Sequence, residues 1–367
     1  MTIRRDLAAL AKAGRVARDR CGAGVALLLC CASLTAAVGP SADPGAQELA
    51  REVANQGWIL FSAKTRQGDY DLFISRPDGS ALRDLTRTPD RDEYGGRFSP
   101  DGQRMLYRRL GKGGAGNPGE GINHDLWGAT GALIVANTDG SAPEAQGPEG
   151  GWPWASWSPD GKQIACLYKR EGKIRIFDLA TKALVRELPR QGIFQQMFWS
   201  PDGMRLCGTA NLNGQDWNVV SLELATGKTV LLTRALNCTA DWFQGDPNRV
   251  VYSHRTPGLA SDYGWTMLMQ ATADGKSRTL IYAERGRHVY YGCTSPDDKY
   301  VIFSLPESDG GTDATMAIVR LADTPIIVPG DYTQLRSFYP DAKSGPVFRL
   351  QQPGFEPHWT RADVGAK

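Results

Sequence analysis

The sequence is poor in the residues that most often carry catalysis or bind metals. Its 367 residues include four histidines and seven cysteines, and no two histidines stand in a short ligand spacing such as His-x-x-x-His. It also has no Gly-x-Ser-x-Gly elbow, no His-Glu-x-x-His motif and no phosphate-binding loop. These absences argue against the common serine hydrolases, zinc peptidases and nucleotide-binding enzymes.

The chain likewise lacks a strong charge of either sign. Its 42 basic and 40 acidic residues leave a net charge of +2, and the two signs are interspersed. A nucleic-acid-binding protein would concentrate basic residues in one patch. We therefore expect no nucleic acid among its partners.

The N-terminus differs in kind from the rest of the chain. Six basic residues between Arg4 and Arg20 precede an uncharged stretch whose apolar core, residues 25–29, is short for a membrane span. This pattern predicts a signal peptide over residues 1–39 and a periplasmic or secreted mature chain without a membrane span. The alternative is an uncleaved N-terminal anchor.

A tetrapeptide, Ser-Pro-Asp-Gly, occurs three times, at residues 99–102, 158–161 and 200–203, and a decayed copy stands at 295–298. Proline presets φ for a turn, Asp accepts hydrogen bonds from the following backbone, and Gly takes the position with positive φ. Each copy should therefore join two strands into a hairpin. The chain is predicted to be a repeat protein built of hairpins.

Each turn follows an anchor position that is aromatic in all but one repeat. The anchors are Phe98, Trp157, Trp199, Trp242, Thr294 and Trp359. The shortest interval between them, 42 residues from Trp157 to Trp199, fits one four-stranded propeller blade. Longer intervals then contain loop insertions. We predict an all-β fold, a six-bladed β-propeller of four-stranded blades.

The two ends of the chain predict how the ring closes. The first readable strands, residues 58–61, 70–74 and 81–86, are the second to fourth strands of a blade that lacks its first strand. Residues 355–359 are a first strand with no blade after it. The C-terminal strand should therefore complete the first blade and remove two open sheet edges.

These repeats resemble those of TolB, the periplasmic protein of the Tol-Pal system. The aromatic-Ser-Pro-Asp-Gly turns, the strand entry at 68–73, the turn at 77–79 and the strand end at Leu85 and Thr86 carry the resemblance. It implies a WD40-like propeller over residues 58–361, followed by a tail at 362–367. TolB itself would also have an α/β domain before the propeller, whereas here we expect a short linker at 40–57. Similar repeats occur in peptidase propeller domains and oligogalacturonate-lyase-like enzymes.

Four cysteines remain after the expected cleavage, and they could pair in three ways. They are Cys166, Cys207, Cys238 and Cys293. All fall in predicted inner strands, which lie about 10 Å apart between neighbouring blades, too far for a disulfide. We predict buried free thiols.

The two faces of the propeller are predicted to differ. The repeated turns lie on one face, the turn face, and their aspartates should be structural. The other face, the loop face, has the irregular segments and the mouth of the channel. Aromatic and polar residues just before each anchor suit a peptide or sugar, although the aromatics could instead pack blade against blade. The predicted ligand-binding residues are Glu93, Tyr94, Trp152, Trp154, Gln195, Gln196, His254, Arg255, His288, Tyr290, Glu356 and His358.

Two functional hypotheses follow. In the first, the chain is an exported, monomeric, non-catalytic propeller without a cofactor that binds a protein or glycan partner through its loop face. In the second, the chain is an enzyme that resembles oligogalacturonate lyases. Histidines at the channel mouth, including His124, would act on an acidic sugar, and they could bind a divalent metal as cofactor. Arg255, Arg285 and Arg287 would then hold the sugar carboxylate.

Overall fold

The computed structural model describes residues 43–112, 131–146, 154–168, 171–212, 217–234, 236–256, 265–284, 287–307, 314–321, 326–327 and 345–364. The chain divides into two units, Met1–Ala37 and Val38–Lys367, and all the described residues belong to the second. The expected signal peptide lies outside the described residues. Where the structure is described, no helix is long and apolar enough to cross a membrane.

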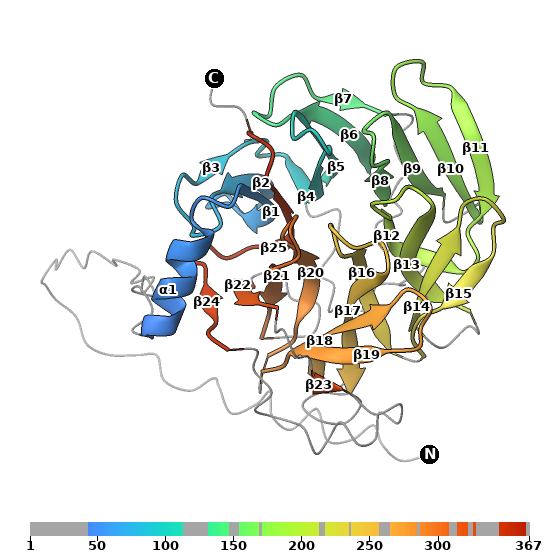
Figure 1. Ribbon diagram of the computed structural model, residues 1–367. Coiled ribbons are helices and arrows are strands. Elements are labelled where there is room, and N and C mark those ends of the chain that lie inside the picture. Colours follow the sequence, from blue (N-terminus) through green and yellow to red (C-terminus); the bar gives the residue numbers. More distant parts are fainter. Residues whose placement is uncertain are drawn as a thin grey trace, which may run out of the picture. The chain divides into compact units, whose positions relative to one another are not determined.

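Six antiparallel sheets form a ring, and each is one blade (Figure 1). Blade 1 contains β25 (Phe355–Thr360), β1 (Trp58–Lys64), β2 (Tyr70–Ser75) and β3 (Arg83–Asp84). Blade 2 contains β4 (Arg91–Phe98), β5 (Arg104–Gly111), β6 (Ala132–Asn137) and β7 (Glu144–Ala145). Blade 3 contains β8 (Ala155–Trp157), β9 (Gln163–Tyr168), β10 (Lys173–Asp178) and β11 (Leu184–Pro189).

The other three blades repeat this order from the channel outward. Blade 4 contains β12 (Ile193–Trp199), β13 (Arg205–Asn211), β14 (Trp217–Glu223) and β15 (Thr229–Leu231). Blade 5 contains β16 (Asn237–Trp242), β17 (Arg249–Thr256), β18 (Trp265–Thr272), β19 (Arg278–Tyr282) and a fifth strand, β23 (Ile326–Ile327). Blade 6 contains β20 (Tyr290–Thr294), β21 (Tyr300–Leu305), β22 (Thr315–Arg320) and β24 (Phe348–Arg349). The six-bladed prediction is confirmed.

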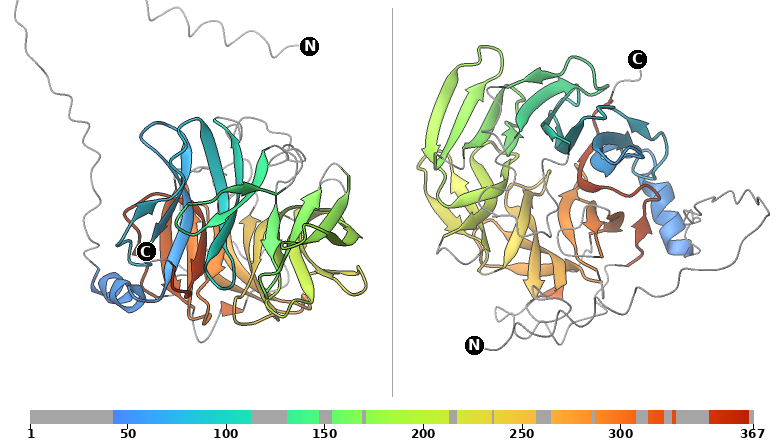
Figure 2. Two further views of the ribbon diagram at one scale, coloured as in Figure 1. Left: turned by 90° about the horizontal axis from the view of Figure 1, so that it is seen from above. Right: turned by 180° about the vertical axis from the view of Figure 1, so that it is seen from behind.

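The ring closes as predicted, because the C-terminal β25 pairs with β1 in register Ile59↔Trp359. In Figure 2 the red C-terminal strand lies beside the blue strands of blade 1. Trp359 is fully buried, and its indole Nε1 donates to Gln56 O over 2.7 Å. The predicted outermost strand at 81–86 is shorter in the structure, β3 spanning only Arg83–Asp84. An outermost strand is paired on one side alone, so its ends are held less firmly.

A helix, α1 (Pro44–Val53), occupies the stretch that we predicted to be a linker. Asp43 caps it by accepting from Gly45 N–H (2.9 Å), and proline stands in its first turn. Its buried residues Leu49 and Val53 pack with apolar residues of blades 1 and 6. Burying this face is what stabilises so short a helix. The helix therefore covers the seam where the ring closes.

The repeated turns have the structural role expected of them. Asp101 accepts from the Ser99 hydroxyl (2.5 Å) and from Gln103 N–H (3.1 Å). The corresponding serine-to-aspartate bond recurs at Asp160, Asp202 and Asp297. These carboxylates serve the turn backbone.

All four cysteines of the propeller are buried and free, as predicted. Burial raises the pKa of the Cys293 thiol to about 12, and it also raises the pKa of Cys166. The thiols are therefore protonated and pack as small apolar groups.

Candidate functional site

The inner strand of each blade runs from the loop face to its anchor, and five of the six are interrupted at one position. The ladder register shifts between Tyr94 and Arg97 in blade 2, and corresponding shifts occur in blades 1, 4, 5 and 6. At each shift, the residue three before the anchor has a positive φ. These residues are Gly95 (64°), Gln196 (45°), Thr239 (51°), Tyr291 (56°) and Glu356 (52°).

This backbone is strained for four of the five residues. A left-handed conformation costs a non-glycine residue about 1–2 kcal/mol, and bulges redirect side chains at the ends of strands. In blade 3 the corresponding residue is Trp154, just before β8. The fold thus imposes one local backbone geometry, and the side chain at that position differs in every blade.

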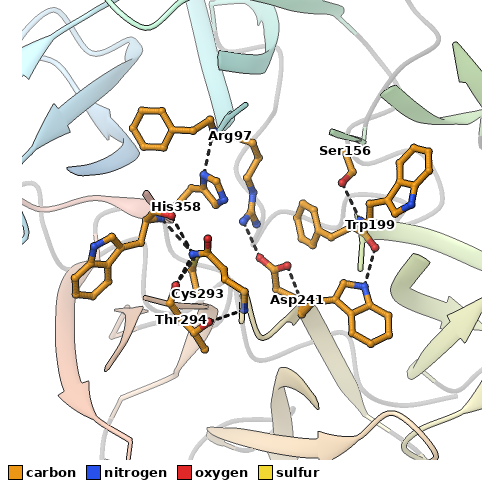
Figure 3. Close-up of polar contacts among 12 residues, drawn as sticks. Arg97, Ser156, Trp199, Asp241, Cys293, Thr294 and His358 are labelled. Carbon is orange, nitrogen blue, oxygen red and sulfur yellow. Dashed lines mark hydrogen bonds and ion pairs between the residues drawn. The ribbon is translucent and has the colours of Figure 1, made fainter. Parts of the chain in front are cut away.

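Closer to the anchors, the channel is crossed by an ion pair between opposite blades (Figure 3). Arg97 Nη1 of blade 2 donates to Asp241 Oδ2 of blade 5 over 2.7 Å, and the two side chains are 11% and 13% exposed. The Arg97 guanidinium carbon also lies 3.8 Å from the ring centre of Phe198 in blade 4. Burial raises the pKa of Asp241, and Arg97 opposes that shift. We call this pair the waist of the channel.

A second buried ion pair lies nearer the mouth. Arg108 of β5 donates through Nη2 to both carboxylate oxygens of Glu356, at 2.9 and 2.7 Å, and the side chains are 7% and 3% exposed. The Arg108 guanidinium carbon lies 4.1 Å from the centre of the Trp154 ring. Residues from blades 1, 2 and 3 therefore meet at one point.

A small cavity lies between the waist and the mouth. Its volume is about 10 Å³. Its lining comprises Gly95, Arg97, Leu106, Arg108, Trp154, Ala155, Phe198, Tyr291 and Glu356. That volume holds about one water. A sugar ring or a peptide is too large to enter this cavity.

Aromatic side chains form much of the wall beside this cavity. Tyr94 lies 5.3 Å from Tyr70 and 5.7 Å from Phe355, measured between ring centres, and Phe355 lies 6.5 Å from Tyr291. Tyr94 and Phe355 are buried, whereas Tyr70 and Tyr291 are only partly buried. Tyr94 thus packs between blades, the alternative that the sequence left open, whereas Tyr291 lines the cavity and is partly buried.

The predicted residues of blades 5 and 6 form a separate cluster. The Arg255 guanidinium carbon lies 5.7 Å from the ring centre of Tyr290, which stacks on His288 with centres 6.0 Å apart. His254 Nδ1 is hydrogen-bonded to Asn237 Oδ1 at 2.9 Å. Burial lowers the pKa of His254 to about 4, so its imidazole is neutral near pH 7.

Four other predicted residues lie at contacts between strands or blades. Glu93 is fully buried and accepts from Arg109 Nε at 2.7 Å, and burial raises its pKa to about 7. The side-chain oxygen of Gln196 accepts from the Thr209 hydroxyl at 2.8 Å and from the N–H of Thr239 in blade 5 at 3.4 Å.

Gln195, next to Gln196 on β12, is also buried. His358 Nδ1 accepts from Phe98 N–H at 3.0 Å, and burial, followed by the charge of Arg97, lowers the pKa of His358. His358 is therefore neutral and holds blade 1 to blade 2.

The structure thus divides the predicted site. Trp154 and Glu356 line the cavity, and Tyr94 packs beside Phe355. Arg255, His288 and Tyr290 form the cluster of blades 5 and 6, whereas His254 bonds to Asn237 within blade 5. Trp152, His124 and Arg285 lie outside the described residues.

Sequence reasoning missed the residues that close the channel. Arg97 and Asp241 each directly precede an anchor, so opposite charges at matching repeat positions were a usable signal. Arg108 stands in a second strand, where the anchor alignment provides no signal.

The described histidines do not assemble a metal site. Among the residues that the structure describes, no three His, Cys, Asp or Glu side chains are grouped so that they could hold a metal ion. His254 instead bonds to Asn237, and His358 contacts the backbone and the ring of Phe98. The lyase-like hypothesis therefore gains no geometric support from this part of the chain.

The sequence matches no protein-family model and no curated protein, but solved structures share its fold. TolB from Acinetobacter baumannii is 16% identical with a TM-score of 0.61, covering 83% of this chain and 67% of that one. Hydrazine synthase from Kuenenia stuttgartiensis is 14% identical with a TM-score of 0.51, covering 83% and 89%. The oligogalacturonate lyase from Vibrio parahaemolyticus is 14% identical with a TM-score of 0.44, covering 74% of each chain, too distant to carry an argument.

At these identities the likeness shows the fold alone, since one propeller fold serves many functions. The chain is a TolB-like six-bladed propeller, as its repeats suggested.

Proposed function

We propose that this chain is an exported, non-catalytic propeller that binds a protein or glycan partner at the loop-face mouth of its channel. The observation that carries this proposal is the position three residues before the anchor. Its backbone is the same in five blades, whereas its side chains are Gly95, Gln196, Thr239, Tyr291 and Glu356. Strained backbone positions and bulges are concentrated at functional sites in proteins.

The chemistry of this ring suits recognition. The ring carries a carboxylate, a guanidinium, an amide and a hydroxyl, but Glu356, Gln196 and Thr239 are buried and already paired within the protein. A ligand at the mouth would therefore stack chiefly on Tyr291, which is only partly buried. The blades hold these groups rigidly, which lowers the entropy lost on binding. The cavity is too small to enclose a substrate, so we favour a partner bound across the mouth.

Export rests on the N-terminal pattern of a basic flank, a short apolar core and small residues. The lyase-like alternative would need histidines that converge at the mouth. His254 bonds to Asn237, His288 stacks on Tyr290 and His358 accepts from the Phe98 backbone, so none of these three contacts joins one histidine to another.

Site-specific photo-crosslinking in cells tests the proposal. A benzophenone amino acid replaces Tyr291 on the loop face or, as the matched control, Asp202 on the turn face of the full chain. We expect defined adducts from position 291 and none from position 202. If only position 202 gives adducts, the partner binds the opposite face and the proposal is wrong.

A glycan partner is tested with the same two positions. Purified protein is applied to a glycan array, and Tyr291→Ala should abolish the signal that Asp202→Ala retains. An equal loss in both variants would contradict a site at the mouth.

A further inference from the structure

Two buried carboxyl groups meet where blade 1 joins blade 2. Asp71 of β2 is 2% exposed, and Glu93 of β4 is fully buried. A side-chain hydrogen bond joins the two carboxyl groups. Two ionised carboxylates cannot form such a bond, because neither has a hydrogen to donate. The contact therefore requires a proton on one of the two.

Both carboxyl groups hold the same residue, Thr88, in the connection between β3 and β4. The Thr88 hydroxyl donates to Glu93 and lies 2.7 Å from each carboxylate oxygen. Thr88 N–H donates to Asp71 Oδ1 over 3.2 Å. Asp71 Oδ1 also accepts from Thr86 Oγ1 at 2.8 Å, and Thr86 Oγ1 accepts from Leu72 N–H at 3.0 Å. The connection is therefore fastened to both blades through this pair.

The charges around the pair do not balance. Arg109 of β5 is the one described cation that is ion-paired with either carboxyl group, through Nε to Glu93 Oε1 at 2.7 Å. Arg109 Nη2 also donates to the hydroxyl of Tyr107 at 2.9 Å. A third acid, Asp84 of β3, is partly buried, and burial followed by the charge of Asp71 raises its pKa. Two ionised carboxylates beside one guanidinium would leave an excess negative charge in the interior.

A bound proton removes that excess charge. Taking an unpaired charge out of water is costly, and two carboxyl groups that share one site ionise one after the other. Burial raises the pKa of Glu93 to about 7, and its hydrogen bond with Asp71 adds to the shift, whereas Thr88 and Arg109 oppose it. The proton is therefore lost in the neutral range of pH.

We propose that Asp71 and Glu93 form a proton-bridged pair that acts as a pH-sensitive latch between blade 1 and blade 2. While the pair keeps its proton, it holds the connection at residues 85–90 closed. When the proton passes to solvent, the two negative charges repel each other and Thr88 loses one of its two acceptors. The latch is independent of any partner bound at the channel mouth.

The direction of the pH effect follows from where the proton is bound. The pKa of Glu93 is about 7 in the folded protein, against an ordinary value of 4.5. Between pH 4.5 and pH 7 the folded protein binds more protons at Glu93 than the unfolded chain does. The contribution of Glu93 to the free energy of unfolding therefore falls as the pH rises through this range. His254, whose pKa is lowered, has the opposite effect, so the test compares variants.

Glu93→Gln should lock the latch, because a neutral amide can donate to Asp71 and accept from Arg109 at every pH. The matched control, Glu144→Gln, removes a 65% exposed carboxylate from the same blade. From pH 6 to pH 8, hydrogen-exchange protection of the Thr88 amide should fall about tenfold in the wild type and in Glu144→Gln, and stay constant in Glu93→Gln. Over this range the unfolding equilibrium constant should rise about tenfold more in the wild type than in Glu93→Gln.

A titration of the wild type by carboxyl-carbon NMR keeps the proposal testable if Glu93→Gln does not fold. The Glu93 carboxyl should titrate with a midpoint at about 7, and a midpoint at its ordinary 4.5 would overturn the latch. Thr88 protection that depends on pH as strongly in Glu93→Gln as in the wild type would also overturn it. So would a pH dependence that Glu144→Gln abolishes, because general charge repulsion would then be its cause.

Discussion

At the turn end of the inner strands, repeats make the same hydrogen bonds, as the serine-to-aspartate bonds at Asp101 and Asp202 illustrate. At the mouth end, the repeats share a backbone bend, yet Gln196, Tyr291 and Glu356 stand at equivalent positions. Repetition of both backbone and side chain indicates a role in folding. A common backbone with different side chains indicates that folding requires the backbone conformation but not a particular side chain. The side chains at the mouth are therefore available for recognition, and we expect binding there.

The largest predicted effect compares the buried ion pair that crosses the channel with an exposed ion pair on the outer strands of blade 3. Arg97→Met should destabilise the protein by about 3–5 kcal/mol, because it leaves the buried charge of Asp241 without its ion-pair partner and with the Trp242 N–H as its remaining donor. Adding Asp241→Asn should restore part of this loss. Denaturant unfolding at neutral pH measures both.

The matched control is the exposed pair of Lys173 and Glu187, whose side chains are 41% and 34% exposed. Lys173→Met should cost less than about 1 kcal/mol. Equal costs for Arg97→Met and Lys173→Met would mean that water reaches the waist and that the channel is open.

The next largest effect is the pH dependence of stability that His254 causes. The pKa of His254 is lowered from 6.5 to about 4 in the folded protein. Between pH 4 and pH 6.5 the unfolded chain binds more protons at His254 than the folded protein does. The contribution of His254 to the free energy of unfolding is therefore fully present above pH 6.5 and is lost as the pH falls toward 4. Over that range, protonation of His254 should lower the free energy of unfolding by on the order of 3 kcal/mol.

Unfolding free energies measured from pH 7 to pH 4 test this expectation. His254→Gln should show a shallower decline than the wild type over that range. A variant as pH-sensitive as the wild type would show that His254 is solvated.

The smallest effect concerns the turns. Asp202→Ala should destabilise blade 4 by about 1 kcal/mol, because Ser200 and the N–H of Met204 lose their acceptor. Thermal unfolding measures this change. Binding at the mouth should be unaffected. If Asp202→Ala weakened partner binding without lowering stability, the turns would bind the partner and our assignment of binding to the mouth would be wrong.

The sequence predicted the fold well because each repeat encodes its hairpin locally. The strand expected at 70–74 is β2 but for one residue, and the closing strand expected at 355–359 is β25 but for one residue. Strand β23 and helix α1 escaped prediction, because each depends on a surface provided by distant blades.

The site was predicted only in part, for a related reason. Counting back from the anchors located Trp154 and Glu356, which line the cavity. The pairs of Arg97 with Asp241 and of Arg108 with Glu356 join residues far apart in the chain. The repeat alignment marks the opposite charges of Arg97 and Asp241 but does not mark Arg108, which stands in a second strand. The contacts themselves form only once the ring has closed.

The most direct test of the account measures binding and stability together in three variants, with the partner identified by crosslinking as the ligand. We predict that Tyr291→Ala weakens binding at least about tenfold, while Tyr291→Phe, which keeps the ring, retains most of the affinity. Asp202→Ala should lower the unfolding temperature and leave the affinity of the folded protein unchanged. The account would be contradicted if Asp202→Ala weakened binding and Tyr291→Ala affected folding alone.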